Sequence, residues 1–142
     1  MKNYIKQSLL SMLLVSGIAL AENTPDIEDI FNKCRDKAYI STVQMNKCSS
    51  DRLEAYDALL NKYYKKALAK CSETDKPKQC KEELKEAERN FIKYKESMLS
   101  HLEKHSLFHN GTIFNSIYLN FAADLTKLQY DTLKDNYIGE EP

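Results

Sequence analysis

The longest uninterrupted helical pattern covers residues 41–71, and it strongly limits the fold class. Along this stretch mostly apolar or small residues recur at steps of three and four, which places them on one stripe of an α-helix. The stretch contains no Pro or Gly, it opens with good N-cap residues at Ser41 and Thr42, and its last turn is rich in lysine, which the helix dipole favours. Such a stripe must pack against another element. It consists of Met45, Cys48, Arg52, Tyr56, Leu60, Tyr63, Ala67 and Cys71.

A second long helix is predicted for residues 78–104, after a polar turn that ends at Pro77. Its apolar or small positions also recur at steps of three and four. Two long helices joined by a short connection form an antiparallel hairpin, in which we expect the two stripes to bury each other. The positions on the second stripe are Cys80, Leu84, Ala87, Phe91, Tyr94, Met98 and Leu102.

A short helix is predicted before the hairpin, within residues 23–38. Thr24 is a candidate N-cap, Pro25 suits the first helical position, and acidic residues follow in the first turn. The apolar spacing predicts an amphipathic helix of about three turns, which is too short to be stable without packing against the rest of the chain.

A last helix is predicted for residues 113–135, after a break at residues 107–113. Asn110 and Gly111 favour a turn in this break, and Thr112 is a candidate N-cap. No β pattern of useful length appears. We therefore expect an all-α fold, with a short N-terminal helix plus three longer helices built on a disulfide-clamped antiparallel helical hairpin. The expected buried face of the last helix carries Ile117, Phe121, Leu125 and Leu128.

The four cysteines are expected to form two disulfides, and helix geometry selects the pairing. Cys48 and Cys71 lie on one helix and would be about 35 Å apart, far more than the ~6 Å between the Cα atoms of a disulfide. Cys80 begins the return helix, so it lies near Cys71 and far from Cys48. The remaining pairing is Cys34 with Cys48 and Cys71 with Cys80. A zinc site is the alternative, but the spacing contains no CxxC pair.

The first 21 residues have the layout of a secretory signal peptide. Lys2 and Lys6 precede an apolar run at residues 9–20, and the small residues Ala19 and Ala21 stand at the third and first positions before the expected cleavage site, which precedes Glu22. The alternative is a retained membrane anchor, but about a dozen apolar residues are too few to span ~30 Å of hydrocarbon. We therefore expect a periplasmic or secreted protein without membrane insertion after signal cleavage, with residues 22–142 forming a single domain.

The charge balance argues against a nucleic-acid-binding protein. The whole chain contains 21 Lys plus Arg and 21 Asp plus Glu, so removal of a signal peptide with two lysines leaves a slight acidic excess. A nucleic-acid-binding domain normally shows a basic excess on one face. The interleaved Lys and Glu residues along the helices are typical of a solvated surface, although a weakly acidic surface also suits a basic protein partner.

The three histidines are the candidate metal ligands. His101 and His105 would share one face at the end of the second long helix, and His109 could supply a third nitrogen to zinc or copper if it folded back. The alternative is that they are solvated residues near a helix C-terminus. The HExxH motif is absent because Glu103 stands midway between the first two histidines. We expect no metal and no cofactor.

Several short motifs follow one another in a recognisable order along the chain. They are Thr42, Met45, Asn46 and Cys48; Asp57, Leu60, Asn61 and Tyr64; Leu84, Ala87, Phe91, Tyr94, Lys95 and Glu96; and Gly111, Thr112 and Ile113 followed by Leu125 and Thr126. Their order and spacing, from about Cys34 to Leu133, resemble the LprI-type lysozyme-inhibitor family. Where that family commonly has a Trp and a further Cys in the second long helix, this chain has Phe91 and Leu99.

The resemblance implies a small exported helical protein of the bacterial envelope whose partner is another protein, with a lysozyme as the expected target. It implies non-covalent occlusion of a muramidase and no enzyme activity. The sequence agrees, because it contains no GxSxG, P-loop or dinucleotide motif. The alternative is an envelope structural or assembly partner without inhibitor activity, and the oligomeric state stays open.

Loops on a rigid helical frame commonly carry binding contacts, so the break between the second and the last long helix is the expected partner-binding element. Its candidate contact residues are Ser106, Asn110, Gly111 and Thr112.

Overall fold

The computed structural model describes residues 26–38 and 41–139, and these residues contain helices and no strand. The all-α prediction is therefore confirmed. The expected signal peptide and the predicted cap at Thr24 and Pro25 lie outside the described residues. The helices are α1 (Ile27–Lys37), α2 (Thr42–Lys70), α3 (Pro77–His105) and α4 (Phe114–Leu133), with a short 3-10 turn η1 (Cys71–Glu73) and a π turn η2 (Lys134–Ile138).

Local chemistry explains where the helices begin. The Asp26 side chain caps α1 by accepting a hydrogen bond of 3.1 Å from the backbone N–H of Asp29. The Ser41 hydroxyl caps α2 in the same way, accepting from the N–H of Gln44 at 3.3 Å. Pro77 occupies the first position of α3, where its missing N–H has no helical partner to lose.

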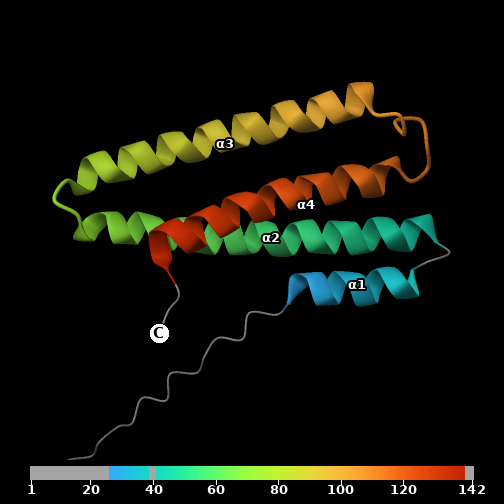
Figure 1. Ribbon diagram of the computed structural model, residues 1–142, viewed down its shortest axis with the longest axis horizontal. Helices are drawn as coiled ribbons and strands as arrows, with labels where there is room; N and C mark the ends of the chain where they lie inside the picture. The colour runs from blue at the N-terminus through green and yellow to red at the C-terminus, as the bar shows by residue number, and fades with distance from the viewer. Residues whose placement is uncertain (1–25, 39–40, 140–142) are drawn as a thin grey trace, which may run out of the picture.

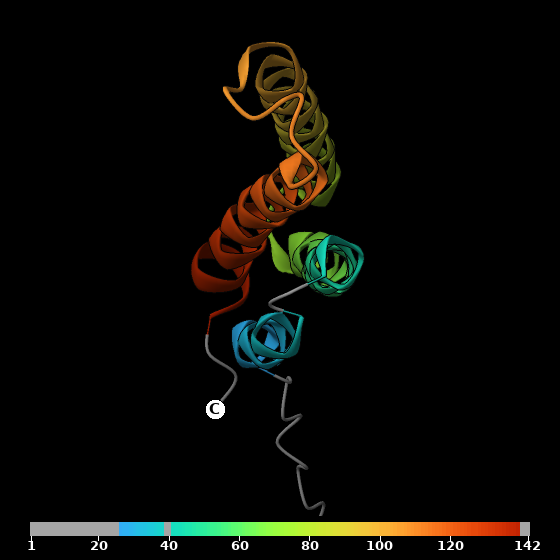
Figure 2. The same cartoon turned by 90° about the vertical axis from the view of Figure 1, so that its right-hand side faces the viewer.

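The helices are arranged around α2, the central element. Helices α2 and α3 run antiparallel and are joined through η1, as predicted (Figure 1). Helix α4 lies between α3 and the pair formed by α1 and α2 (Figure 2). Accordingly α2 packs mainly along α4 and α1, whereas α3 lies chiefly against η1 and α4. The expectation that the α2 and α3 stripes bury each other is therefore wrong along most of their length.

The core lies near the η1 end of the bundle, where all three long helices meet. Tyr63 packs edge-on against Tyr130 of α4, with the ring centroids 5.0 Å apart. Two positions of the predicted α3 stripe, Ala87 and Tyr94, are exposed, because α3 turns this side toward solvent. The buried core cluster consists of Tyr56, Leu60, Ala67, Cys71, Leu84, Ala123, Tyr130 and Leu133.

Helix α4 buries a different face from the one that its large apolar residues predict. Ile117 and Phe121 are only half-buried, and Leu128 is 61% exposed. The side that meets the rest of the bundle carries many small residues, which let the α4 backbone come close to α2. The predicted stripe is thus wrong except at Leu125, which is buried. The buried residues of α4 are Ser116, Ala122, Ala123, Leu125, Thr126, Tyr130 and Leu133.

Both predicted disulfides are present. Cys34 and Cys48 join α1 to α2 with their Cα atoms 5.8 Å apart, and Cys71 and Cys80 join η1 to the start of α3 at 5.5 Å. Paired cysteines are typical of proteins that mature in an oxidising compartment. Within residues 26–38 and 41–139, no helix has both the length and the apolar character needed to cross a membrane.

Candidate partner-binding site

The connection between α3 and α4, residues 106–113, forms the end of the bundle opposite η1 and is called the tip below (Figure 1). Three large apolar side chains are open to solvent there. Leu107 is 95% exposed, Phe108 56% and Ile113 46%. A cluster of exposed apolar side chains on one connection is a common mark of a protein contact, because single exposed residues are ordinary but gathered ones are not.

The backbone of the tip is fixed by hydrogen bonds of its own. The Ser106 hydroxyl accepts from the N–H of Phe108 at 3.1 Å, and the Ser106 carbonyl oxygen lies 2.8 Å from Nδ1 of His109. The N–H of Gly111 donates to the carbonyl of Phe108 at 2.8 Å, and the N–H of Phe114 donates to the carbonyl of Gly111 at 3.0 Å. The apolar side chains therefore project from an ordered turn, which lowers the entropy lost on binding.

Gly111 is favoured by a close approach. A Cβ atom at this position would lie 3.2 Å from the carbonyl oxygen of Phe108, so a larger residue would need this carbonyl to move by a few tenths of an ångström. Its φ is not positive, so the reason differs from the usual one for an Asn-Gly turn. The predicted cap at Thr112 is wrong: Ile113 holds the N-cap position of α4 and makes no side-chain capping bond.

The predicted contact residues of the tip divide into two groups. Asn110, Gly111 and Thr112 are exposed, whereas Ser106 is half-buried and holds the turn. The predicted contact element includes Leu107 and Phe108, but the sequence analysis did not single them out. The sequence could have predicted their exposure. Two large apolar residues that are adjacent in a break between helices do not lie on the apolar face of either helix.

The three histidines do not converge. The rings of His101 and His105 lie side by side, with centroids 4.8 Å apart. The His109 ring is instead hydrogen-bonded through Nδ1 to the Ser106 carbonyl oxygen. In the part of the chain that the structure describes, no three His, Cys, Asp or Glu side chains are grouped so that they could hold a metal ion.

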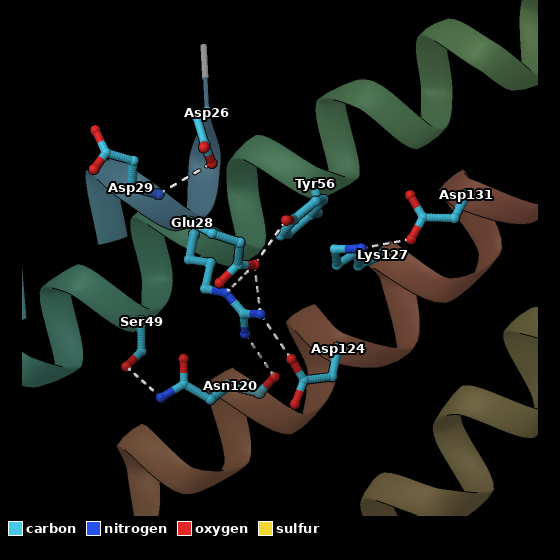
Figure 3. A network of polar contacts seen from close by, with 10 residues as sticks. Asp26, Glu28, Asp29, Ser49, Tyr56, Asn120, Asp124, Lys127 and Asp131 are labelled. Carbon is cyan, nitrogen blue, oxygen red and sulfur yellow. Dashed lines mark hydrogen bonds and ion pairs between the residues drawn. The ribbon is translucent and has the colours of Figure 1, made fainter. Parts of the chain in front are cut away.

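An ion-pair network around the buried Arg52, called the Arg52 network below, joins α1, α2 and α4. Arg52 is only 8% exposed and lies in the predicted apolar stripe of α2. Its Nη2 is 2.7 Å from Oε1 of Glu28 and 2.8 Å from Oδ1 of Asp124. The Tyr56 hydroxyl donates to the same Glu28 oxygen at 2.7 Å, and Figure 3 shows Glu28, Tyr56 and Asp124 coming together from three helices.

Burial and charge act in opposite directions on the carboxyl group of the Arg52 network. Burial by itself would raise the pKa of Glu28, but hydrogen bonds from Arg52 and Tyr56 outweigh it and hold this pKa below its usual value. Burial, followed by the hydrogen bond to Glu28, raises the pKa of Tyr56. The guanidinium carbon of Arg52 also lies 5.1 Å from the ring centroid of Phe31, a distance that suits a cation–π contact. The arrangement is structural, since its charged groups are bound to one another.

The residues that carried the family resemblance are brought together only in part. The residues that line one groove between α2 and α3 are Asp57, Leu60, Asn61, Phe91, Lys95 and Glu96. The rest of the motif residues lie apart from it. Thr42 is exposed at the start of α2, Met45 and Tyr64 are half-buried on α2, Tyr94 is exposed on α3, Gly111 is in the tip, and Asn46 accepts a hydrogen bond of 2.8 Å from Ser116 of α4.

Thr126 belongs to a polar contact between α3 and α4, which is called the polar tie below. Its side chain is fully buried, and its oxygen accepts a hydrogen bond of 2.6 Å from the ammonium of Lys95. The same hydroxyl donates to the carbonyl of Ala122 at 2.8 Å. The Lys95 ammonium also lies 3.4 Å from the carboxylate of Asp57 on α2. One cation thus joins all three long helices.

Comparison with known proteins gives one family. A family model described as lysozyme inhibitor LprI matches residues 34–133, which is most of the chain. No curated protein and no solved structure matches.

Proposed function

Because the chain belongs to the lysozyme inhibitor LprI family, we propose that it is an exported binding protein that occludes a muramidase without chemistry. The proposed working form is the mature chain, residues 22–142, acting as one domain in the periplasm or outside the cell. Its partner is another protein, with a lysozyme as the first candidate.

The observation that carries this proposal is the exposure of Leu107 and Phe108 on an ordered turn at one end of the bundle. A protruding turn fits a concave surface such as an enzyme cleft, and apolar side chains held at its end supply the buried contact area that dominates binding. The hydrogen bonds within the tip keep it in one conformation before binding, which favours affinity.

A binding role also agrees with the chemistry of the side chains. All four cysteines are bonded in disulfides, so no thiol is left as a nucleophile. The slight acidic excess expected after signal removal would favour association with a basic enzyme, mainly by raising the association rate.

The test is a cell-wall lysis assay in which the oxidised mature protein is titrated against c-type, g-type and i-type lysozymes. We expect inhibition near one equivalent for at least one type. The variant Leu107→Ser with Phe108→Ser should weaken inhibition by about tenfold or more, because both side chains would lie in the contact. The matched control is Leu128→Ser, which changes an exposed leucine far from the tip. Full activity of all three enzymes at a large excess of inhibitor would refute the proposal.

A second candidate function is an envelope structural or assembly partner, and the outer face of α4 favours it. Leu128 is largely exposed, and Phe121, two turns before it on the same helix, is only half-buried, so apolar side chains are open to solvent along this helix. Sedimentation of the unmodified protein and of Leu128→Ser distinguishes the two functions. Self-association that the substitution abolishes, in a protein that inhibits no lysozyme, would favour the structural role.

A further inference from the structure

A groove separates α2 from α3 at the middle of the two helices. The helices are held together by the Cys71–Cys80 disulfide at one end and separate beyond it, because α4 rather than α3 packs along α2 (Figure 1). The resulting groove encloses about 290 Å³. It is lined by Asp57, Leu60, Asn61, Glu88, Phe91, Ile92, Lys95, Glu96 and Leu99.

The base of the groove is apolar. Leu60 of α2 and Leu99 of α3 are buried beneath it, and Phe91 is half-buried at its side. Ile92 is 47% exposed and extends this apolar surface outward. Apolar side chains from another molecule would therefore be stabilised here by leaving water.

The polar residues that line the groove are mainly acidic. Three carboxylates, those of Asp57, Glu88 and Glu96, stand against the single ammonium of Lys95. That ammonium is already engaged, since it donates to Thr126 at 2.6 Å and lies 3.4 Å from Asp57. Glu96 is exposed, so its negative charge faces solvent at the edge of the groove.

An apolar base with acidic edges selects the chemistry of its occupant. We infer that the groove between α2 and α3 binds a cationic amphipathic helix of a partner protein. In this mode the apolar face of the helix covers Phe91 and Ile92, and its Lys or Arg side chains reach Glu96 and the neighbouring carboxylates. Laying one helix face into an apolar groove is a common form of peptide recognition, and the opposite charges fix its orientation.

This inference goes beyond the proposed function, because the groove residues and the tip residues are different. If the protein inhibited no lysozyme, we would still expect it to bind the peptide described below. Conversely, if the groove bound no peptide, the tip could still inhibit a lysozyme. Each proposal can therefore be refuted without refuting the other.

The experiment uses the oxidised mature protein and a fluorescein-labelled synthetic peptide of Leu and Lys, spaced to form an amphipathic helix of about four turns. Fluorescence anisotropy at low salt measures its affinity. A second peptide, with Glu in place of every Lys, tests the charge requirement. We expect saturable binding of the cationic peptide and no binding of the acidic one. The affinity for the cationic peptide should fall as the salt concentration is raised, because salt screens the attraction between opposite charges.

Matched variants locate the peptide on the surface. Glu96→Lys should weaken binding by about fivefold or more, whereas Glu86→Lys, an equal charge reversal at an exposed position of α3, should change it by less than about twofold. Ile92→Ser should weaken binding by a similar factor, with Val43→Ser as its control, since Val43 is an exposed residue on a distant turn of α2.

Three outcomes would overturn the inference. The first is the absence of saturable binding below about 1 mM peptide, the limit of weak association. The second is equal weakening by Glu96→Lys and Glu86→Lys, which would mean attraction by overall charge. The third is a dimer of the protein that Ile92→Ser dissociates, which would assign the groove to a second copy of this chain.

Discussion

The two sides of the domain are held by different means. On one side, α1 and α4 are joined to α2 by a disulfide, the Arg52 network and the close contact of small side chains. On the other side, beyond α4, helix α3 is attached by the Cys71–Cys80 disulfide, by Leu84 in the core and, at its middle, by Lys95. The side with dense contacts provides the larger share of the stability. The side with few contacts leaves a groove and a tip for binding.

The largest expected effect comes from the densely packed side. Arg52→Ala should lower the free energy of unfolding by about 3 kcal/mol, because it removes the shared cation and leaves Glu28 and Asp124 facing each other. Urea denaturation at pH 7 measures it. The control is Lys47→Ala, which removes an exposed pair with Asp51 and should change stability by less than about 0.5 kcal/mol. A loss below about 1 kcal/mol for Arg52→Ala would mean that this network is not the main support of that side.

The attachment of α3 should be nearly as important for stability but local in its effect. Replacing both Cys71 and Cys80 by Ser should lower the free energy of unfolding by about 2 to 3 kcal/mol in the chain-entropy model. Hydrogen exchange should then become faster along α3 while α2 and α4 stay protected. Faster exchange spread evenly over all helices would contradict the division into two sides.

A smaller effect is expected at the polar tie in the middle of α3. Thr126→Val keeps the shape of the side chain but removes the acceptor of the Lys95 ammonium, so stability should fall by about 1 to 2 kcal/mol. The control is Thr132→Val, an exposed position on the same helix, where the change should be a few tenths of a kcal/mol. Equal effects at the two positions in thermal denaturation would show that the tie does not hold α3.

The smallest expected effect is the dependence of stability on pH. Because the folded-state pKa of Glu28 is lowered, its ionised form favours the folded state above its usual value of 4.5, and this contribution is lost as pH falls through the lowered folded-state pKa. The partial exposure of its side chain keeps the contribution below about 1 kcal/mol. Glu28→Gln should therefore flatten the fall in stability between about pH 5 and pH 3 in urea titrations. An unchanged slope would show that other carboxyl groups cause it.

The sequence predicted the features that depend on spacing along a helix. Residues four or three apart share a face in any α-helix, so the long helices followed from the pattern. Because a helix also fixes the distance between its own residues, Cys48 and Cys71 could be excluded as partners, and this led to both disulfides. The family resemblance followed from the order of motifs over the same helices.

The sequence did not predict which helices meet, because that depends on residues far apart in the chain. The face of α4 was assigned from its largest apolar side chains, whereas the actual contact uses Ala123 and Thr126, whose small size allows close approach. Arg52 did carry a sequence signal, because a charged residue inside an apolar stripe needs partners of opposite charge. Its partners, Glu28 and Asp124, could not be found from local pattern.

Helix α3 is fixed near both of its ends. The disulfide holds the beginning, and the tip returns the chain directly into α4, which is packed on α2. Between these ends, the Lys95 ammonium ties the middle of α3 to Thr126 of α4 and to Asp57 of α2. The helix therefore behaves as a beam on three supports, and the groove lies at the middle one. Its width is set before an occupant arrives, which lowers the cost of binding.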